Sequence, residues 1–399
     1  MYARLSRPFK SQAMQLTKPI SLLRPSLGSM PSLSLGKPSL PFSGKKSTSL
    51  AGLSIEAGSV AVAAVDSNGS GELLSSAVHP LQPGVFQEGE VIDADGLVAA
   101  LKALYGSQKL PKRVRLGVGN QRVIVRTLRL PAIEDPKSME AAIRFQAQEQ
   151  IPMPLDQAVL RHQVVGGVAA QGDSGPQVDV VVVAARRDMI ASFLEPLRRA
   201  GLEPAGVDLS AFGMIRALAA AVPAPAPEGD GTVPGQEAVL YCNVGDVLNL
   251  AVARGRSCLF TRVSGTGIEA IAARLVAERG LSPEHSVQWL LHVGLDVPVE
   301  SLDGDAETIT AVRVALREGT AGLVDELRRS LDYYGTLESA VPVSRILICG
   351  TGSAIRGLAP AMEEQVGLPI SAPRPPALAA LDDVSAARLV LPLGLGLES

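Results

Sequence analysis

Three short glycine-containing turns are the segments of this sequence best suited to binding a ligand. They are Glu56-Ala57-Gly58-Ser59, Asn243-Val244-Gly245-Asp246 and Gly350-Thr351-Gly352-Ser353. Glycine lets a ligand approach the backbone closely, and the N–H groups of such a turn can cradle an anion such as a phosphate. One turn of this kind is weak evidence for a phosphate site, whereas three in one chain strengthen the case.

The segments around the three turns predict two similar halves of the chain. Residues 51–65 predict two short strands around the first turn, and residues 238–253 predict the same hairpin around the second. Residues 346–349 predict a strand that enters the third turn. Asp208 or Ser210 is expected to cap a helix over residues 211–221. We therefore expect two similar lobes that face a cleft.

The charge of the chain is unevenly distributed. Its 399 residues include 37 Lys and Arg and 40 Asp and Glu, a net charge of −3. Residues 1–49 hold eight basic residues and no acid, so the remainder, with 29 basic and 40 acidic residues, carries −11. Eleven Ser and six Pro also fall in residues 1–49, a composition typical of a disordered tail.

The composition excludes several classes of protein. Aromatic residues make up 3% of the chain, which argues against a protein that stacks nucleic-acid bases. Cys242, Cys258 and Cys349 lie too far apart for a zinc motif, and they favour a reducing cytoplasm. No run of 18 apolar residues predicts a membrane-spanning helix. The histidines show no metal-ligand spacing, so we expect no metal ligands among the side chains.

Further motifs narrow the identification to one family. They are Leu128-Arg129-Leu130-Pro131, Ile151-Pro152-Met153-Pro154-Leu155-Asp156, Val183 to Asp188, Ala200 to Pro204 and the C-terminal Leu393 to Leu397. The three turns resemble the two phosphate loops and the adenosine loop of actin-like ATPases. With the motifs in this order, the chain resembles the type IV pilus assembly protein PilM family, a pilus branch of the actin-like fold that is related to FtsA. The resemblance covers about residues 50–398.

The resemblance implies an α/β protein with the actin-like, ribonuclease H-like two-lobed fold and an inserted small α+β subdomain. The expected parts are a disordered basic tail over residues 1–49, a first lobe over 50–118 and 178–222, the insertion over 119–177, a Pro/Gly-rich linker over 223–236, a second lobe over 237–375, and a C-terminal segment over 376–399 that packs back on the first lobe.

The function that the resemblance implies is that of a cytoplasmic scaffold at the inner face of the cell membrane. Such a scaffold binds ATP, with Mg²⁺, between its lobes. It docks the N-terminal tail of PilN and links the inner-membrane pilus platform to the motor. The implied nucleotide neighbours are Gly58, Ser59, Asn243, Gly245, Gly350, Gly352 and Ser353. The basic tail is expected to contact anionic lipid, and no catalytic residue and no nucleic-acid partner are expected.

The sequence departs from the family pattern at charged positions. Aligned without gaps, the family's first-loop Asp falls on Ser54, its Lys on Ala61 and its second-loop Asp on Asn243. These acids normally orient magnesium-bound waters, and the lysine neutralises phosphate charge. A two-residue shift would place Glu56 and Gly58 in an acid-x-Gly-Ser pattern, but it breaks the ungapped match. The departures leave ATP binding open and argue against hydrolysis.

Three alternatives remain open at this point. The chain could be a degenerate actin-like interaction module that binds no nucleotide. It could be an FtsA-like division protein, although FtsA relatives usually end in an amphipathic helix and residues 386–399 are apolar and nearly uncharged. It could be a phosphotransfer enzyme of the same superfamily, which would need a catalytic Asp where Ser54 and Asn243 stand.

Overall fold

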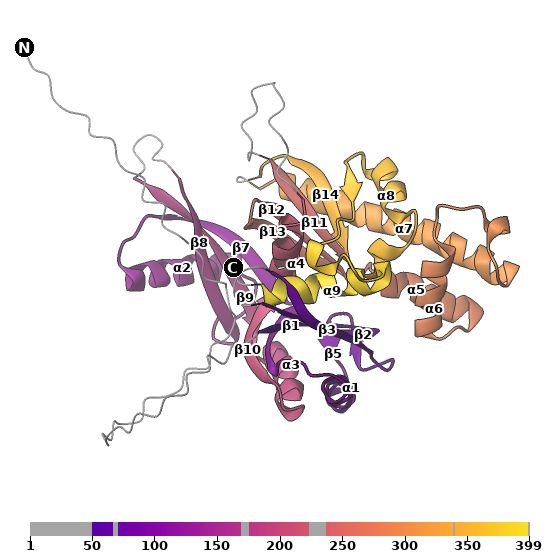
Figure 1. The fold of residues 1–399 in the computed structure, drawn as a ribbon. Helices are drawn as coiled ribbons and strands as arrows, with labels where there is room; N and C mark the ends of the chain where they lie inside the picture. The colour runs from indigo at the N-terminus through magenta and orange to yellow at the C-terminus, as the bar shows by residue number, and fades with distance from the viewer. Residues whose placement is uncertain (1–49, 67–70, 169–174, 223–236, 338–339, 398–399) are drawn as a thin grey trace, which may run out of the picture.

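The computed structural model shows two α/β lobes and a smaller inserted sheet beside the first lobe (Figure 1). The described residues are 50–66, 71–168, 175–222, 237–337 and 340–397. The expected tail and linker therefore lie outside the described residues.

The first lobe is built on a five-stranded sheet with the order β10-β6-β1-β2-β3. β1, β2 and β3 form an antiparallel meander, β6 runs parallel to β1, and β10 runs parallel to β6. The strands are β1 (Ala51–Glu56), β2 (Ser59–Val65), β3 (Leu73–Pro80), β6 (Arg113–Val118) and β10 (Glu203–Leu209). Every residue of β2 is buried, because helices cover both faces of this sheet.

The helices of the first lobe lie on opposite sides of its sheet (Figure 1). α1 (Ala94–Ser107) and α3 (Arg187–Arg199) lie on one side, and α4 (Ser210–Ala219) and α9 (Asp383–Gly396) lie on the other. The side chain of Asp93 begins α1 by accepting the Asp95 and Gly96 N–H groups, as an N-cap does. A small hairpin of β4 (Phe86–Gln87) and β5 (Glu90–Val91) precedes α1.

The second lobe repeats the topology of the first. Its sheet has the order β13-β12-β11-β14-β15, with an antiparallel meander followed by two parallel strands. The strands are β11 (Ala238–Val244), β12 (Leu248–Arg254), β13 (Ser257–Ser264), β14 (Val343–Cys349) and β15 (Ile370–Ser371). The helices are α5 (Ile268–Arg279), α6 (Pro283–Val293), α7 (Ala306–Gly335) and α8 (Leu358–Val366), with short 3₁₀ turns at η1 (Val299–Ser301), η2 (Thr351–Ala354) and η3 (Pro376–Leu378). The expectation of two similar lobes is confirmed.

The inserted sheet has the order β7-β9-β8, with α2 (Pro136–Gln150) packed on it. Its strands are β7 (Val123–Pro131), β8 (Ala158–Val168) and β9 (Gln177–Arg186). We expected the chain to return to the first lobe at residue 178, but β9 pairs with both β7 and β8. Val180 and Val182 belong to the core under α2, whereas Val181 and Val183 belong to the core of the first lobe. A strand that is covered on both faces shows the same continuous apolar run whether it belongs to the first lobe or to the inserted subdomain. The run alone therefore could not place β9.

The C-terminal helix α9 crosses β1 and α4 at very close range. A Cβ on Gly52 would lie 1.9 Å from the Pro392 carbonyl oxygen, and a Cβ on Gly394 would lie 1.8 Å from that of Gly213. Only glycine permits these contacts. None of the helices in the described part of the chain combines the length and the apolar character that a bilayer crossing needs.

A buried ion pair joins β10, α4 and α9. The Arg216 Nη2 lies 2.6 Å from the Asp208 Oδ2, with side chains that are 7% and 1% exposed. The Arg216 Nε donates to the Gly394 carbonyl oxygen at 2.8 Å. The expectation that Asp208 or Ser210 caps the following helix is wrong, because α4 begins at Ser210 without a side-chain cap and Asp208 pairs with Arg216 instead.

Replacing Arg216 with Met should lower the free energy of unfolding by about 3–5 kcal/mol, because it leaves the Asp208 carboxylate buried and unpaired. Urea denaturation measures the change. Arg199→Met is the matched control: its pair with Asp95 is exposed on both sides, so its loss should change the free energy of unfolding far less. Equal effects of the two substitutions would contradict the structural role of the buried pair.

Candidate functional site

The first glycine turn is the tip of the β1–β2 hairpin. β1 ends at Glu56 and β2 begins at Ser59, so Ala57 and Gly58 form the turn. Gly58 is exposed, and an added Cβ would meet nothing within 4 Å. Ser54 pairs with Ala61 inside the sheet, where both are buried. The two positions at which the resemblance predicts charged residues are thus neutral and enclosed here.

The second glycine turn lies at the equivalent place in the second lobe. β11 ends at Val244, and Gly245 and Asp246 lead into β12. The Gly245 carbonyl oxygen accepts the Ile268 N–H at 2.7 Å, which ties the turn to the first residue of α5. Asn243 is 3% exposed and lies between two neighbouring strands of the sheet.

The two turns contact each other directly across the lobes. The Ala57 N–H donates to the Asp246 Oδ2 at 3.0 Å. The Asn243 Nδ2 donates to the Glu56 Oε1 at 3.3 Å. A Cβ on Gly245 would lie 2.6 Å from that same Glu56 oxygen. The close approach therefore requires glycine at position 245 unless Glu56 moves.

The third glycine turn packs against the second. Gly350 has a φ of 81°, and a Cβ there would lie 2.1 Å from the Asn243 Oδ1. A Cβ on Gly352 would lie 2.5 Å from the Val244 Cγ1. The Ser353 Oγ donates to the Gly350 carbonyl oxygen at 2.8 Å and so closes its own turn. The second and third turns form one tightly packed unit.

The acids of this region have raised pKa values. Enclosure of the carboxyl raises the pKa of Glu56, against the lowering effects of the Asn243 hydrogen bond and the Arg388 charge. Burial and the neighbouring Glu56 charge raise the pKa of Asp246 to about 8. Burial also raises the pKa of Glu269, whose charge adds to the effect on Asp246. Such shifts mark groups that are enclosed beside charges of the same sign.

The residues of this contact do not fit the phosphates of a nucleotide in the arrangement observed. Asp246 accepts the N–H groups of Ala57 and Val247, so these donors already serve a carboxylate of the protein. Glu56 adds a second acid where a phosphate would need positive charge or free donors. Among the residues that the structure describes, no three His, Cys, Asp or Glu side chains are placed to hold a metal ion.

The structure brings four of the seven expected nucleotide neighbours together, but they pack against one another instead of lining an open site. Asn243, Gly245, Gly350 and Gly352 meet where the second and third turns pack. Gly58 lies at the exposed hairpin tip and Ser59 begins β2. The ungapped match leaves Glu56 outside the expected site, and turn chemistry gives Asp246 only the role of a turn residue. The signal that could have found them is that each lobe opens with a hairpin whose turn carries an acid.

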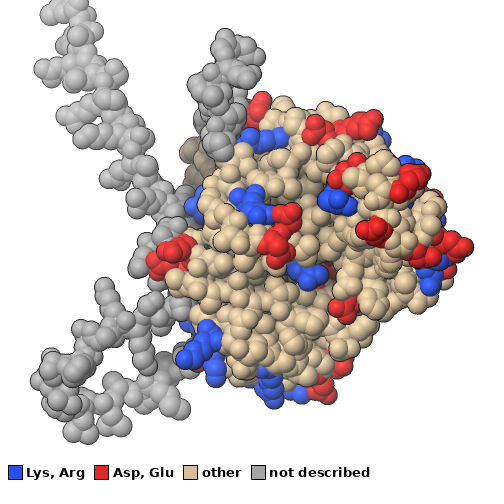
Figure 2. Space-filling view, turned by 45° about the vertical axis from the view of Figure 1, so that its right-hand side comes forward, with Lys and Arg blue, Asp and Glu red and all other residues tan. Residues whose placement is uncertain are grey.

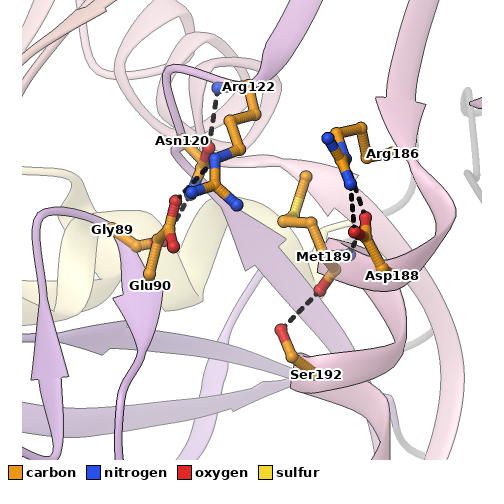
Figure 3. Close-up of polar contacts among 8 residues, drawn as sticks. All are labelled: Gly89, Glu90, Asn120, Arg122, Arg186, Asp188, Met189 and Ser192. Carbon is orange, nitrogen blue, oxygen red and sulfur yellow. Dashed lines mark hydrogen bonds and ion pairs between the residues drawn. The ribbon is translucent and has the colours of Figure 1, made fainter. Parts of the chain in front are cut away.

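A second polar region holds the inserted subdomain to the first lobe (Figure 3). The Asn120 Nδ2 donates to the Gly89 carbonyl oxygen at 2.8 Å, and the Asn120 Oδ1 accepts the Arg122 N–H at 2.7 Å. The Arg122 Nε also lies 2.9 Å from the Glu90 Oε1. These contacts fix the β6–β7 connection to the β4–β5 hairpin.

The other half of this junction lies where β9 enters α3 (Figure 3). The Arg186 Nε donates to the Asp188 Oδ1 at 3.0 Å, and Asp188 also accepts the Met189 N–H at 2.8 Å. The Arg186 guanidinium and then the Met189 N–H lower the pKa of Asp188 to about 2. The Ser192 Oγ donates to the Met189 carbonyl oxygen at 2.8 Å. We name the contacts around Glu90, Arg122, Arg186 and Asp188 the subdomain junction.

Comparison with known proteins gives this architecture a family. Residues 52–295 match the family model of the type IV pilus assembly protein PilM. The chain belongs to the PilM family. This PilM-family chain is also similar to a solved chain of the "PilM-PilN type IV pilus biogenesis complex", with 25% identity and a TM-score of 0.70 over 88% of this chain and 98% of that chain. The fold is therefore actin-like, and the family's role is type IV pilus assembly.

Two further solved structures are more distantly similar to this PilM-family chain. The ethanolamine utilization protein EutJ from Carboxydothermus hydrogenoformans is 12% identical, with a TM-score of 0.48 over 88% of this chain and 89% of that chain. MreB 5 of Spiroplasma citri, solved with bound AMPPNP, is also 12% identical, with a TM-score of 0.45 over 86% of this chain and 94% of that chain.

Two of the expected nucleotide neighbours should differ sharply in their tolerance of a side chain. Gly350→Ala should lower the free energy of unfolding by about 2 kcal/mol or more, because it combines a left-handed backbone with a clash against Asn243. Gly58→Ala should change it by less than about 0.5 kcal/mol, since its Cβ meets open space. Urea denaturation measures both. A tolerated Gly350→Ala would show that the second and third turns are not packed as described.

Proposed function

We propose that this chain is a docking scaffold of the type IV pilus assembly platform, which holds the N-terminal tail of PilN and links the platform to the motor. The observation that carries the proposal is the similarity to a chain of the PilM–PilN complex, which extends over 98% of that chain at a TM-score of 0.70. That extent includes both lobes, so the likeness is not limited to a shared nucleotide-binding core.

The place of action that follows is the cytoplasmic face of the inner membrane, which the chain reaches through PilN. Residues 1–49 carry eight basic residues and no acid. A segment of this charge is attracted to anionic lipid by about 1 kcal/mol per basic residue near the surface. We therefore assign this segment the role of an additional tether.

The proposed contact for the PilN tail is the subdomain junction. The Arg122, Arg186 and Asp188 side chains are 53%, 47% and 60% exposed there. Figure 2 shows charged side chains of both signs spread over the face in view, rather than one continuous charged field. Charged groups fixed on two neighbouring bodies can bind the backbone and side chains of a short peptide that contacts both.

The affinity of a fluorescent PilN-tail peptide, measured by anisotropy, tests this proposal. The full chain should bind the peptide, and Arg122→Glu should weaken binding by about tenfold because it reverses one charge of the junction. Arg144→Glu, at an exposed position of α2, is the matched control and should bind as the natural chain does. Failure of the natural chain to bind would contradict the docking function. Unchanged binding by Arg122→Glu would contradict only the placement at the junction.

Nucleotide binding is the second candidate function. The observation that favours it is the meeting of Asn243, Gly245, Gly350 and Gly352 at the place that the actin-like resemblance assigns to ATP. The bond from Ala57 to Asp246 opposes it, because a carboxylate of the protein already occupies the backbone donor of the first turn. We therefore propose that docking needs no bound ATP.

Titration of the full chain with fluorescent ATP, with and without Mg²⁺, separates the two candidates. We expect no saturation below about 1 mM, which corresponds to a binding free energy weaker than about −4 kcal/mol. Binding of the PilN-tail peptide by the same preparation serves as the control for folded protein. Saturation at micromolar ATP would contradict a nucleotide-independent scaffold and favour an ATP-binding one.

A further inference from the structure

The side chains of Glu56 and Asp246 occupy the contact between the two lobes. Asp246 belongs to the second lobe and accepts an N–H from the first, while Glu56 belongs to the first and accepts an N–H from Asn243 of the second. We propose that these two acids form a proton-linked latch, in which the closed lobes retain one proton on the pair and open when that proton is lost. This proposal does not depend on PilN docking.

The two acids differ in the hydrogen bonds that they accept. Both oxygens of Asp246 accept a backbone N–H, from Ala57 at 3.0 Å and from Val247 at 2.7 Å. A carboxylate with two such donors is stabilised in its charged form. The Glu56 Oε1 accepts one longer bond of 3.3 Å from Asn243. The two groups nevertheless titrate as a pair, so the proton of the closed state belongs to the pair and not to one acid.

The charges around the latch come from several elements. Arg388 of α9 faces Glu56 and favours its ionised form. Burial, then the Cys242 and Glu56 charges, raise the pKa of the Cys349 thiol. Glu269 of α5 adds negative charge beside Asp246. Glu269 itself accepts a backbone hydrogen bond from Glu88 of the β4–β5 hairpin and also faces that residue's charge. The acids thus outnumber the single arginine, so a second negative charge on the pair is opposed.

The direction of the pH dependence follows from the raised pKa values of the pair. The closed chain keeps a proton that the unfolded chain releases above about pH 4. Its contribution to stability is complete below that pH and is lost as the pH rises toward the raised value, which for Asp246 is about 8. Above that pH two negative charges face each other in an enclosed contact, and separation of the turns relieves their repulsion.

The pH profile of urea unfolding for the full chain and for Glu56→Gln tests the latch. The folding equilibrium constant of the natural chain should fall by about tenfold or more from about pH 5.5 to about pH 8.5. Glu56→Gln keeps an acceptor for Asn243 and removes one charge, so its constant should fall less than about threefold. Glu149→Gln, an exposed acid of α2, should retain the full fall, since the histidines titrate equally in all three proteins.

The variant Asp246→Asn distinguishes a specific role of the two acids in the contact from a mere effect of removing one negative charge. An amide can replace only one of the two acceptor oxygens, so this variant should be less stable than Glu56→Gln at every pH. A flat profile for the natural chain, or equal profiles for the natural chain and Glu56→Gln, would overturn the proposal.

Distance measurements between spin labels follow the opening without unfolding. Labels at Lys102→Cys in the first lobe and Glu284→Cys in the second occupy exposed helix positions, and the three natural cysteines are buried. The distribution of label distances should shift to longer values as the pH rises in the otherwise natural chain, and it should stay constant with Glu56→Gln. A distribution that does not change with pH in either protein would also overturn the proposal.

Discussion

The hydrogen bond from the Ala57 amide to the Asp246 carboxylate sets how the first two glycine turns meet across the lobes, beside an apolar core that the two lobes share. It joins the tips of two hairpins that stand at equivalent places in two sheets of the same topology. Once these tips meet, Asn243 must lie beside Glu56, and glycine is required at positions 245 and 350 because any Cβ would enter the contact. The close packing thus accounts for the glycines of the second and third turns, whereas Gly58 at the exposed tip of the first turn is not required by it.

The same contact shows how this member of the PilM family holds its two lobes together with neutral residues where the resemblance predicts charged ones. Ser54 and Ala61 are buried in the first sheet and carry no charge. Carboxyl groups of the chain itself occupy the contact between the first two turns, so this contact needs no phosphate. In the proposed scaffold, docking depends on how the lobes and the inserted subdomain are held together. Within the first lobe, the buried Arg216–Asp208 pair joins α4 to β10, and the close glycine contacts hold α9 against β1 and α4.

The local pattern of residues predicts the elements well and the contacts between them poorly. The hairpins over residues 51–65 and 238–253 follow from turn chemistry and apolar strands, and both are present. The apolar run of β9 indicates a strand covered on both faces, but it cannot say which sheet the strand joins. Asp208 has the chemistry of a helix cap, yet it pairs with an arginine two turns along. The pairing of Ala57 with Asp246 spans 189 positions, and no periodicity carries information over that separation.

A carbon-13 NMR titration of the side-chain carboxyl carbons tests the central claim most directly, with the Glu56 and Asp246 signals assigned by Glu56→Gln and Asp246→Asn. The account predicts that the two signals change together and that one proton is held until about pH 8, the raised pKa of Asp246. It also predicts that the signal of Asp246 moves to a lower pKa in Glu56→Gln, because the neighbouring charge is gone. Two independent titrations near pH 4 would contradict it.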